Sequence, residues 1–93
     1  MTPDWDVVGH VISSRHRTLV LGRLADSPAT PTQIASDVEI ASTHVSRALN
    51  SLRDRGLVEL LVPEDRRKGR VYGITTKGSD TWDVIQSQGL AEE

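Results

Sequence analysis

The segment from Ser42 to Gly56, STHVSRALNSLRDRG, constrains this chain more than any other because it divides into two faces. Its apolar residues follow the i, i+3, i+4, i+7 spacing that lines up one side of a helix: Val45, Ala48, Leu49 and Leu52. The opposite side, at about 100° per residue, carries hydroxyl, amide and guanidinium groups: Thr43, Ser46, Arg47 and Asn50. We therefore predict an amphipathic helix with Ser42 as its N-cap and Gly56 as its C-terminal stop.

The polar face of this helix differs from an ordinary solvated surface, which interleaves Glu and Lys. Hydroxyl, amide and guanidinium groups hydrogen-bond the base edges and phosphates of DNA. Arg47 can form a bidentate pair with guanine, and Asn50 can do so with adenine. The pattern therefore indicates a DNA recognition helix.

A helix-start signal lies just before this segment. Thr30 is a good N-cap, Pro31 suits the first helical position, and Gln33 can close a capping box. We expect this helix to run to about Asp37, with residues 38–41 forming the turn into the recognition helix. Two helices joined by a short turn, the second with a polar outer face, are typical of a helix-turn-helix.

The rest of the chain predicts flanking helices and a hairpin. Helices are expected at about residues 3–12, 14–25 and 76–88, with Asp4, Ser14 and Thr75 at their starts and Gly78 weakening the last one. After Gly56 the pattern becomes extended at 57–62 and 70–74, around a polar, basic loop. The expected fold is α+β and mainly helical: a winged helix-turn-helix with a three-helix core, a two-stranded β wing and flanking terminal helices. We expect one domain over residues 1–93, with the helix-turn-helix at about 31–55 and the wing at about 57–74.

Positive charge is concentrated in one part of the chain, although the formal net charge is −2 at pH 7. Residues 42–70 carry seven Lys and Arg against four Asp and Glu, whereas the remainder carries four against nine. This distribution fits a protein with one face that meets phosphate, although chance variation of surface charge would look the same.

Several classes of function are excluded by the residues. The chain has no Cys, and His10, His16 and His44 lack metal-site spacing, so we expect neither a metal nor a cofactor. There is no Gly-rich phosphate loop, HExxH motif or Ser nucleophile with a positioned base, so we expect no enzymatic activity. No apolar run could cross a bilayer and no signal peptide is visible, so we expect a cytoplasmic protein without membrane contact.

From Pro31 to about Asp83, the chain resembles the winged helix-turn-helix of MarR-like and ArsR-like transcription regulators, and of small archaeal and phage winged-helix repressors. The resemblance rests on Ile34-Ala35, on V-S-R-x-L-x-x-L-x-x-x-G-L-V from Val45, and on T-x-K-G from Thr75. It implies major-groove contacts from the recognition helix and minor-groove or phosphate contacts from the wing. The expected DNA-binding residues are Thr43, His44, Ser46, Arg47 and Asn50 on the recognition helix, Thr32 at the start of the preceding helix, and Arg66, Arg67, Lys68 and Arg70 on the wing.

The resemblance also places a dimer interface on the terminal helices, where we expect Trp5, Val8, Ile12, Trp82 and Ile85 to contribute. These flanking helices are short for a MarR-like protein, so we expect no small-molecule effector. The expected function is that of a homodimeric repressor that binds specific sequences in double-stranded DNA. A winged-helix module that binds another protein, without sequence-specific DNA binding, stays open as the alternative because the fold alone does not separate the two.

Overall fold

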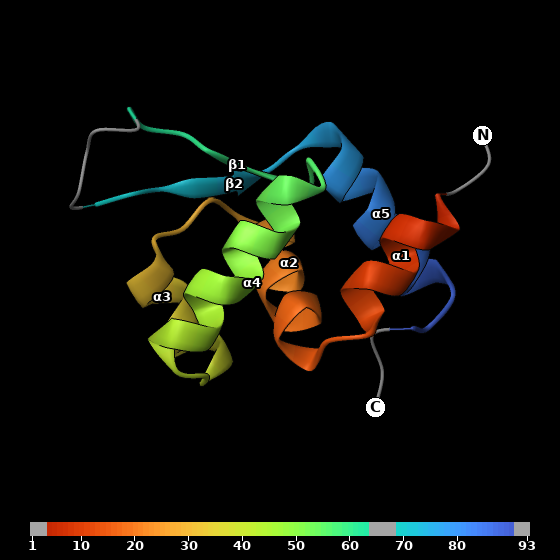
Figure 1. The fold of residues 1–93 in the computed structure, drawn as a ribbon, viewed down its shortest axis with the longest axis horizontal. Coiled ribbons are helices and arrows are strands. Elements are labelled where there is room, and N and C mark those ends of the chain that lie inside the picture. Colours follow the sequence, from red (N-terminus) through yellow and green to blue (C-terminus); the bar gives the residue numbers. More distant parts are fainter. Residues whose placement is uncertain (1–3, 64–68, 91–93) are drawn as a thin grey trace.

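The computed structural model describes residues 4–63 and 69–90. Within these ranges the elements are α1 (Trp5–Ile12), α2 (Arg15–Asp26), α3 (Pro31–Val38), α4 (Ser42–Asp54), β1 (Val58–Leu60), β2 (Tyr72–Ile74) and α5 (Thr76–Ser87). α1 and α5 lie together at one end of the molecule, whereas α3 and the start of α4 lie at the other (Figure 1). This arrangement confirms the predicted α+β winged helix-turn-helix.

Side-chain caps start most of these helices as the sequence predicts. The side chains of Asp4, Ser14 and Thr75 each accept a hydrogen bond from a backbone N–H in the first turn of α1, α2 and α5. Thr30 and Gln33 form the expected capping box at the start of α3, with Pro31 in the first turn.

The start of α4 corrects one prediction. Ser42 lies inside the helix, and the N-cap is Ala41, which makes no side-chain capping bond. The backbone of Ala41 is extended, at φ −63° and ψ 144°, and its carbonyl accepts hydrogen bonds from the N–H groups of His44 and Val45. The helix therefore begins at Ser42, one residue earlier than predicted, since an N-cap at Ser42 would have made Thr43 the first helical residue.

The end of α4 confirms the role expected for Gly56. This glycine has φ +74°, the left-handed conformation that residues with a Cβ adopt only at a cost. Its N–H donates to the carbonyl of Arg53 at 2.9 Å, and the N–H of Leu57 donates to that of Leu52 at 3.0 Å. The paired bonds form a Schellman motif, which turns the chain sharply from α4 toward β1.

The core is aliphatic, as a chain without Phe requires. The predicted apolar side of α4 is buried and packs with α2 at the centre of the molecule. α1 and α5 cover the other side of α2, and Val8 and Ile85 are 2% and 0% exposed. These two side chains therefore belong to the chain's own core and not, as expected, to a dimer surface.

The hairpin strands are shorter than the predicted segments at 57–62 and 70–74. β1 and β2 pair antiparallel, with Val58 opposite Ile74 and Leu60 opposite Tyr72. Ala29, just before α3, exchanges two backbone hydrogen bonds with Tyr72, at 3.0 and 2.9 Å. β2 is therefore paired on both edges, and the chain entering α3 is fixed to the base of the hairpin.

Gly78 has a structural role that the sequence did not indicate. A Cβ built on this residue would lie 2.0 Å from the carbonyl oxygen of Leu57 and 2.7 Å from Cγ1 of Ile74. The first turn of α5 therefore packs directly against the backbone that leaves α4. The hydroxyl of Thr75 supports this approach by donating to the carbonyl of Gly56 at 2.6 Å.

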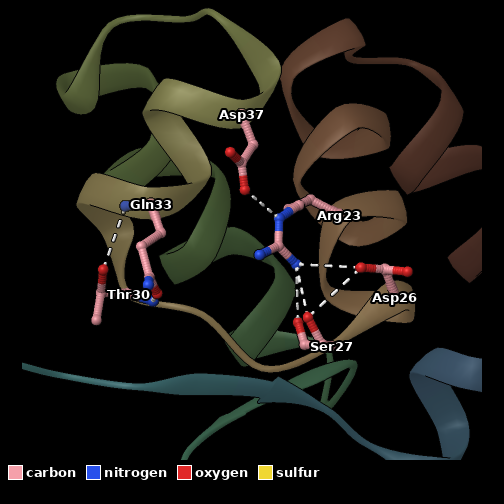
Figure 2. Close-up of polar contacts among 6 residues, drawn as sticks. All are labelled: Arg23, Asp26, Ser27, Thr30, Gln33 and Asp37. Carbon is pink, nitrogen blue, oxygen red and sulfur yellow. Dashed lines mark hydrogen bonds and ion pairs between the residues drawn. The ribbon is translucent and has the colours of Figure 1, made fainter.

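Arg23 joins α2 to the helix-turn-helix (Figure 2). Its Nε donates to Oδ2 of Asp37 in α3 at 2.7 Å, and its Nη1 donates to the carbonyl and Oγ of Ser27 at 3.0 and 3.2 Å. The Arg23 side chain is only 17% exposed, whereas that of Asp37 is 51% exposed. This contact fixes α3 against the C-terminal end of α2.

Candidate nucleic-acid interface

The polar side of α4 is uncovered in the structure. Thr43, Ser46, Arg47 and Asn50 are all exposed, while the apolar side of the same helix lies in the core. Asp54 is exposed on the same side, one turn beyond Asn50. The arrangement presents hydrogen-bond donors and acceptors along one stripe, which we call the polar stripe: Thr43, Ser46, Arg47 and Asn50.

One flank of the polar stripe faces the hairpin. The guanidinium of Arg53 lies over the ring of Tyr72 in β2, 5.9 Å from the ring centroid, which is within the range of a cation–π contact. Of the expected wing residues, Arg70 is half-buried just before β2, and Arg66, Arg67 and Lys68 lie outside the described residues.

The other flank of the polar stripe faces α1 and the start of α2. The imidazole of His44 stacks on that of His16, with ring centroids 4.3 Å apart and an angle of 20° between the planes. About two turns further along α4, Oγ of Ser51 lies 3.0 Å from Nε2 of His10 in α1. α4 is therefore held by the hairpin on one side and by two histidines from other helices on the opposite side.

The pKa of His10 is displaced from its ordinary value. Burial lowers the pKa of His10 below its ordinary value of 6.5, and the positive charges of Arg17 and Arg55 lower it further. The contact with Ser51 acts in the opposite direction. The neutral imidazole is therefore the form that suits the packed interface between α1 and α4.

Thr32, the residue expected at the start of the helix-turn-helix, is exposed in the first turn of α3. Its neighbour Gln33 is held by the capping box, since its Oε1 accepts the N–H of Thr30 at 2.9 Å. The side chain of Thr32 is therefore accessible at this helix start.

The expected dimer residues separate into exposed and packed side chains. Trp5 is 53% exposed and Ile12 is 38% exposed. Trp82 is half-buried, and its ring lies so close to Gly22 that a Cβ there would be 2.6 Å from Cη2. Trp82 therefore packs α5 against α2, while Trp5 and Ile12 keep an apolar surface on α1.

Sequence reasoning missed the contacts that join the start of α2 to the end of α1. Arg17 donates from Nε to the carbonyl of His10 at 2.6 Å and from Nη2 to Oγ of Ser13 at 2.7 Å. It thereby satisfies acceptors at the end of α1. An arginine in the first turn of α2, which opposes the helix dipole, is the signal that could have indicated such a partner.

The family model described as the HVO_A0261 N-terminal domain matches residues 5–88. The chain belongs to this family. The match includes every described helix and strand, from α1 to α5. No match was found among the curated proteins.

Solved structures show the same fold in regulators of the MarR and ArsR type. NMB1585, a MarR family regulator from Neisseria meningitidis, is 23% identical with a TM-score of 0.70, over 80% of this chain and 53% of its own. The homodimeric winged helix-turn-helix DNA-binding domain of Mb0332 from Mycobacterium bovis, a possible ArsR-family regulator, is 25% identical with a TM-score of 0.71, over 91% and 77%. MepR of S. aureus, solved in a DNA complex, is 21% identical with a TM-score of 0.70, over 89% and 70%. This chain thus spans about half the length of NMB1585. The resemblance to the MarR and ArsR superfamily is confirmed at the level of the fold.

Neither a membrane-spanning helix nor a metal-binding cluster is present among the described residues. They contain no helix with the length and apolar character needed to span a bilayer. They also hold no cluster of three or more His, Cys, Asp or Glu side chains able to bind a metal ion.

Proposed function

We propose that this protein is a transcription regulator that binds specific sequences in double-stranded DNA. The observation that carries the proposal is the uncovered polar stripe on α4, on a helix whose opposite side is locked into the core. An α-helix fits the major groove, and in winged helix-turn-helix proteins the second helix of the motif enters it. The regulators of the same fold support this function.

Within the polar stripe, we assign base recognition to Arg47 and Asn50. Arg47 would donate to O6 and N7 of guanine, and Asn50 would pair with N6 and N7 of adenine. Thr43, Ser46 and Thr32 would contact phosphates or base edges, as hydroxyl groups do. The wing residues Arg66, Arg67, Lys68 and Arg70 would follow the adjacent backbone or minor groove.

Selection of binding sites from random-sequence duplexes tests this function. We expect an enriched sequence that Arg47→Ala binds about tenfold to a hundredfold more weakly, with a smaller effect on a scrambled duplex. Lys77→Ala, which removes an exposed cation from α5, is the matched control and should bind both duplexes as the unaltered protein does. Equal losses on both duplexes would reduce Arg47 to a phosphate contact. Failure to bind any duplex at low ionic strength would favour the alternative, a module that docks on another protein.

We also propose that the protein acts as a homodimer through α1. Trp5 and Ile12 are seven residues apart and therefore share one side of the helix, with the exposed Gly9 between them. An exposed apolar stripe with a small residue at its centre suits close packing against the same helix of a second copy. The homodimeric state of the Mb0332 domain, which has this fold, supports the proposal.

The dimer is tested by sedimentation at micromolar concentration. Trp5→Ser with Ile12→Ser should yield monomers, whereas Leu61→Ser, which alters an exposed apolar residue beside β1, should stay dimeric. A monomeric unaltered protein would contradict the proposal.

Repression is the regulatory outcome we assign to such a dimer, since occupancy of a site within a promoter blocks transcription without further partners. A reporter gene under the selected site should fall in activity when the protein is present.

A further inference from the structure

We propose that His16, on α2, is part of the DNA interface and forms a phosphate-binding pair with His44 of α4. The pair would bind the duplex backbone on the flank of the polar stripe that faces away from β2. This inference rests on the proposed function, because it assumes that the polar stripe enters a major groove. It adds a residue outside the helix-turn-helix and its wing.

The position of the pair follows from the turn of the helix. At about 100° per residue, His44 lies about a quarter turn away from the centre of the polar stripe. Arg53, over Tyr72, lies about a quarter turn away on the other side. The major groove is about as wide as a helix with its side chains, so side chains at the centre meet base edges and those on the flanks meet the two backbones.

The stacking of the two rings leaves their nitrogens available for a ligand. With the planes 20° apart and the centroids 4.3 Å apart, the rings cover each other's faces and not their edges. A neutral imidazole carries one N–H donor at its edge in either tautomer, and a protonated one carries two. His44 is exposed and His16 is half-exposed, so a phosphate oxygen can reach donors from two helices at one place.

The surroundings of His16 favour an anion. The first turn of α2 contains Arg15 and Arg17 and no acidic residue. The N-terminal end of a helix also carries partial positive charge, so arginines there raise the potential further. A phosphate at this position would interact favourably with the positive end of the α2 dipole. The flank away from the hairpin would thereby have a phosphate contact of its own.

Replacement of each histidine by phenylalanine tests the pair. Phenylalanine keeps a stacking ring and removes both ring nitrogens, so α2 and α4 stay packed while the donors are lost. Using the duplex obtained by site selection and a scrambled duplex, we expect His16→Phe and His44→Phe each to weaken binding to both about tenfold. The ratio between the two duplexes should stay the same. His16→Arg should restore the affinity. No such recovery is expected if His16 serves only to stack on His44.

Phosphate ethylation locates the contact. In the unaltered protein, ethylation of a phosphate on the backbone remote from the wing should interfere with binding, and this interference should disappear in both phenylalanine variants. Unchanged affinity and an unchanged interference pattern in His16→Phe would overturn the inference. In that case, loss of sequence discrimination in Arg47→Ala would still support the proposed function. The two proposals can therefore fail separately.

Discussion

Nε of Arg23 donates a hydrogen bond to Oδ2 of Asp37 at 2.7 Å, across fourteen residues of sequence. The same guanidinium binds the carbonyl and hydroxyl of Ser27, so one side chain connects α3 with the C-terminal end of α2 (Figure 2). Because the Arg23 side chain is 17% exposed, its charge is largely shielded from water, which strengthens the contact.

Removal of this guanidinium should destabilise the fold. Arg23→Gln should lower the free energy of unfolding by about 1–2 kcal/mol, the value of a hydrogen bond to a charged group discounted for the half-exposed Asp37. Urea denaturation measures the loss. A double-mutant cycle with Asp37→Asn should assign about 0.5–1 kcal/mol to the pair itself. Additive effects of the two substitutions would show that the pair contributes no coupling.

Gly78 should tolerate no side chain. Gly78→Ala would place a methyl group 2.0 Å from the carbonyl oxygen of Leu57, which the backbone on both sides prevents from moving freely. We expect a loss of about 1–3 kcal/mol in unfolding free energy from overpacking, in spite of alanine's higher helix propensity. Ser79→Ala, at an exposed position in the same turn, is the control and should change stability by less than about 0.5 kcal/mol. Equal stability of the two variants would contradict the close packing of α5.

An added N-cap should stabilise α4. Ala41 occupies the cap position with extended backbone angles and supplies no side-chain acceptor. Ala41→Asp should therefore raise the free energy of unfolding by about 1 kcal/mol. Ser42→Ala should have little effect, because Ser42 lies within the helix. A loss of about 1 kcal/mol in Ser42→Ala would instead identify the serine as the cap. Thermal and urea unfolding of the two variants would decide between the positions.

His10 should make stability depend on pH. Its pKa in the folded chain is lowered from 6.5, first by burial and then by Arg17 and Arg55. The unfolded chain therefore binds more protons between the two pKa values, so this contribution to stability is complete above about pH 6.5 and is lost as the pH falls below it. The urea midpoint should decrease between about pH 7.5 and about pH 5.5, and this decrease should be smaller in His10→Gln. An equal decrease in both proteins would exclude His10 as its cause.

Local patterns in the sequence predicted the helices and the exposed face of α4 well. The spacing of Val45, Ala48, Leu49 and Leu52 selected the buried side, and Thr30 and Gln33 marked the start of α3. These signals are local because caps and helical periodicity involve residues within about two turns of each other.

Contacts between distant residues account for what the sequence could not predict. No local pattern connects Arg23 with Asp37, or His16 with His44, because the packing of whole helices determines which side chains meet. The resemblance places Val8 and Ile85 in a dimer interface, whereas both are buried in the chain's own core. A resemblance to a family does not reveal which neighbour covers an apolar side of a helix. The wing residues Arg66, Arg67 and Lys68 lie outside the described residues, so their role stays a prediction.

The double hydrogen bond between Ala29 and Tyr72 has a consequence for exchanging parts between such proteins. A hairpin transplanted from a relative would carry with it the strand edge that anchors the entry to α3. Its backbone geometry at the position of Tyr72 would then set the tilt of α3 as well as the reach of the wing. Chimeras that alter wing length should therefore keep residues 71–74 and change only the loop that connects β1 with β2.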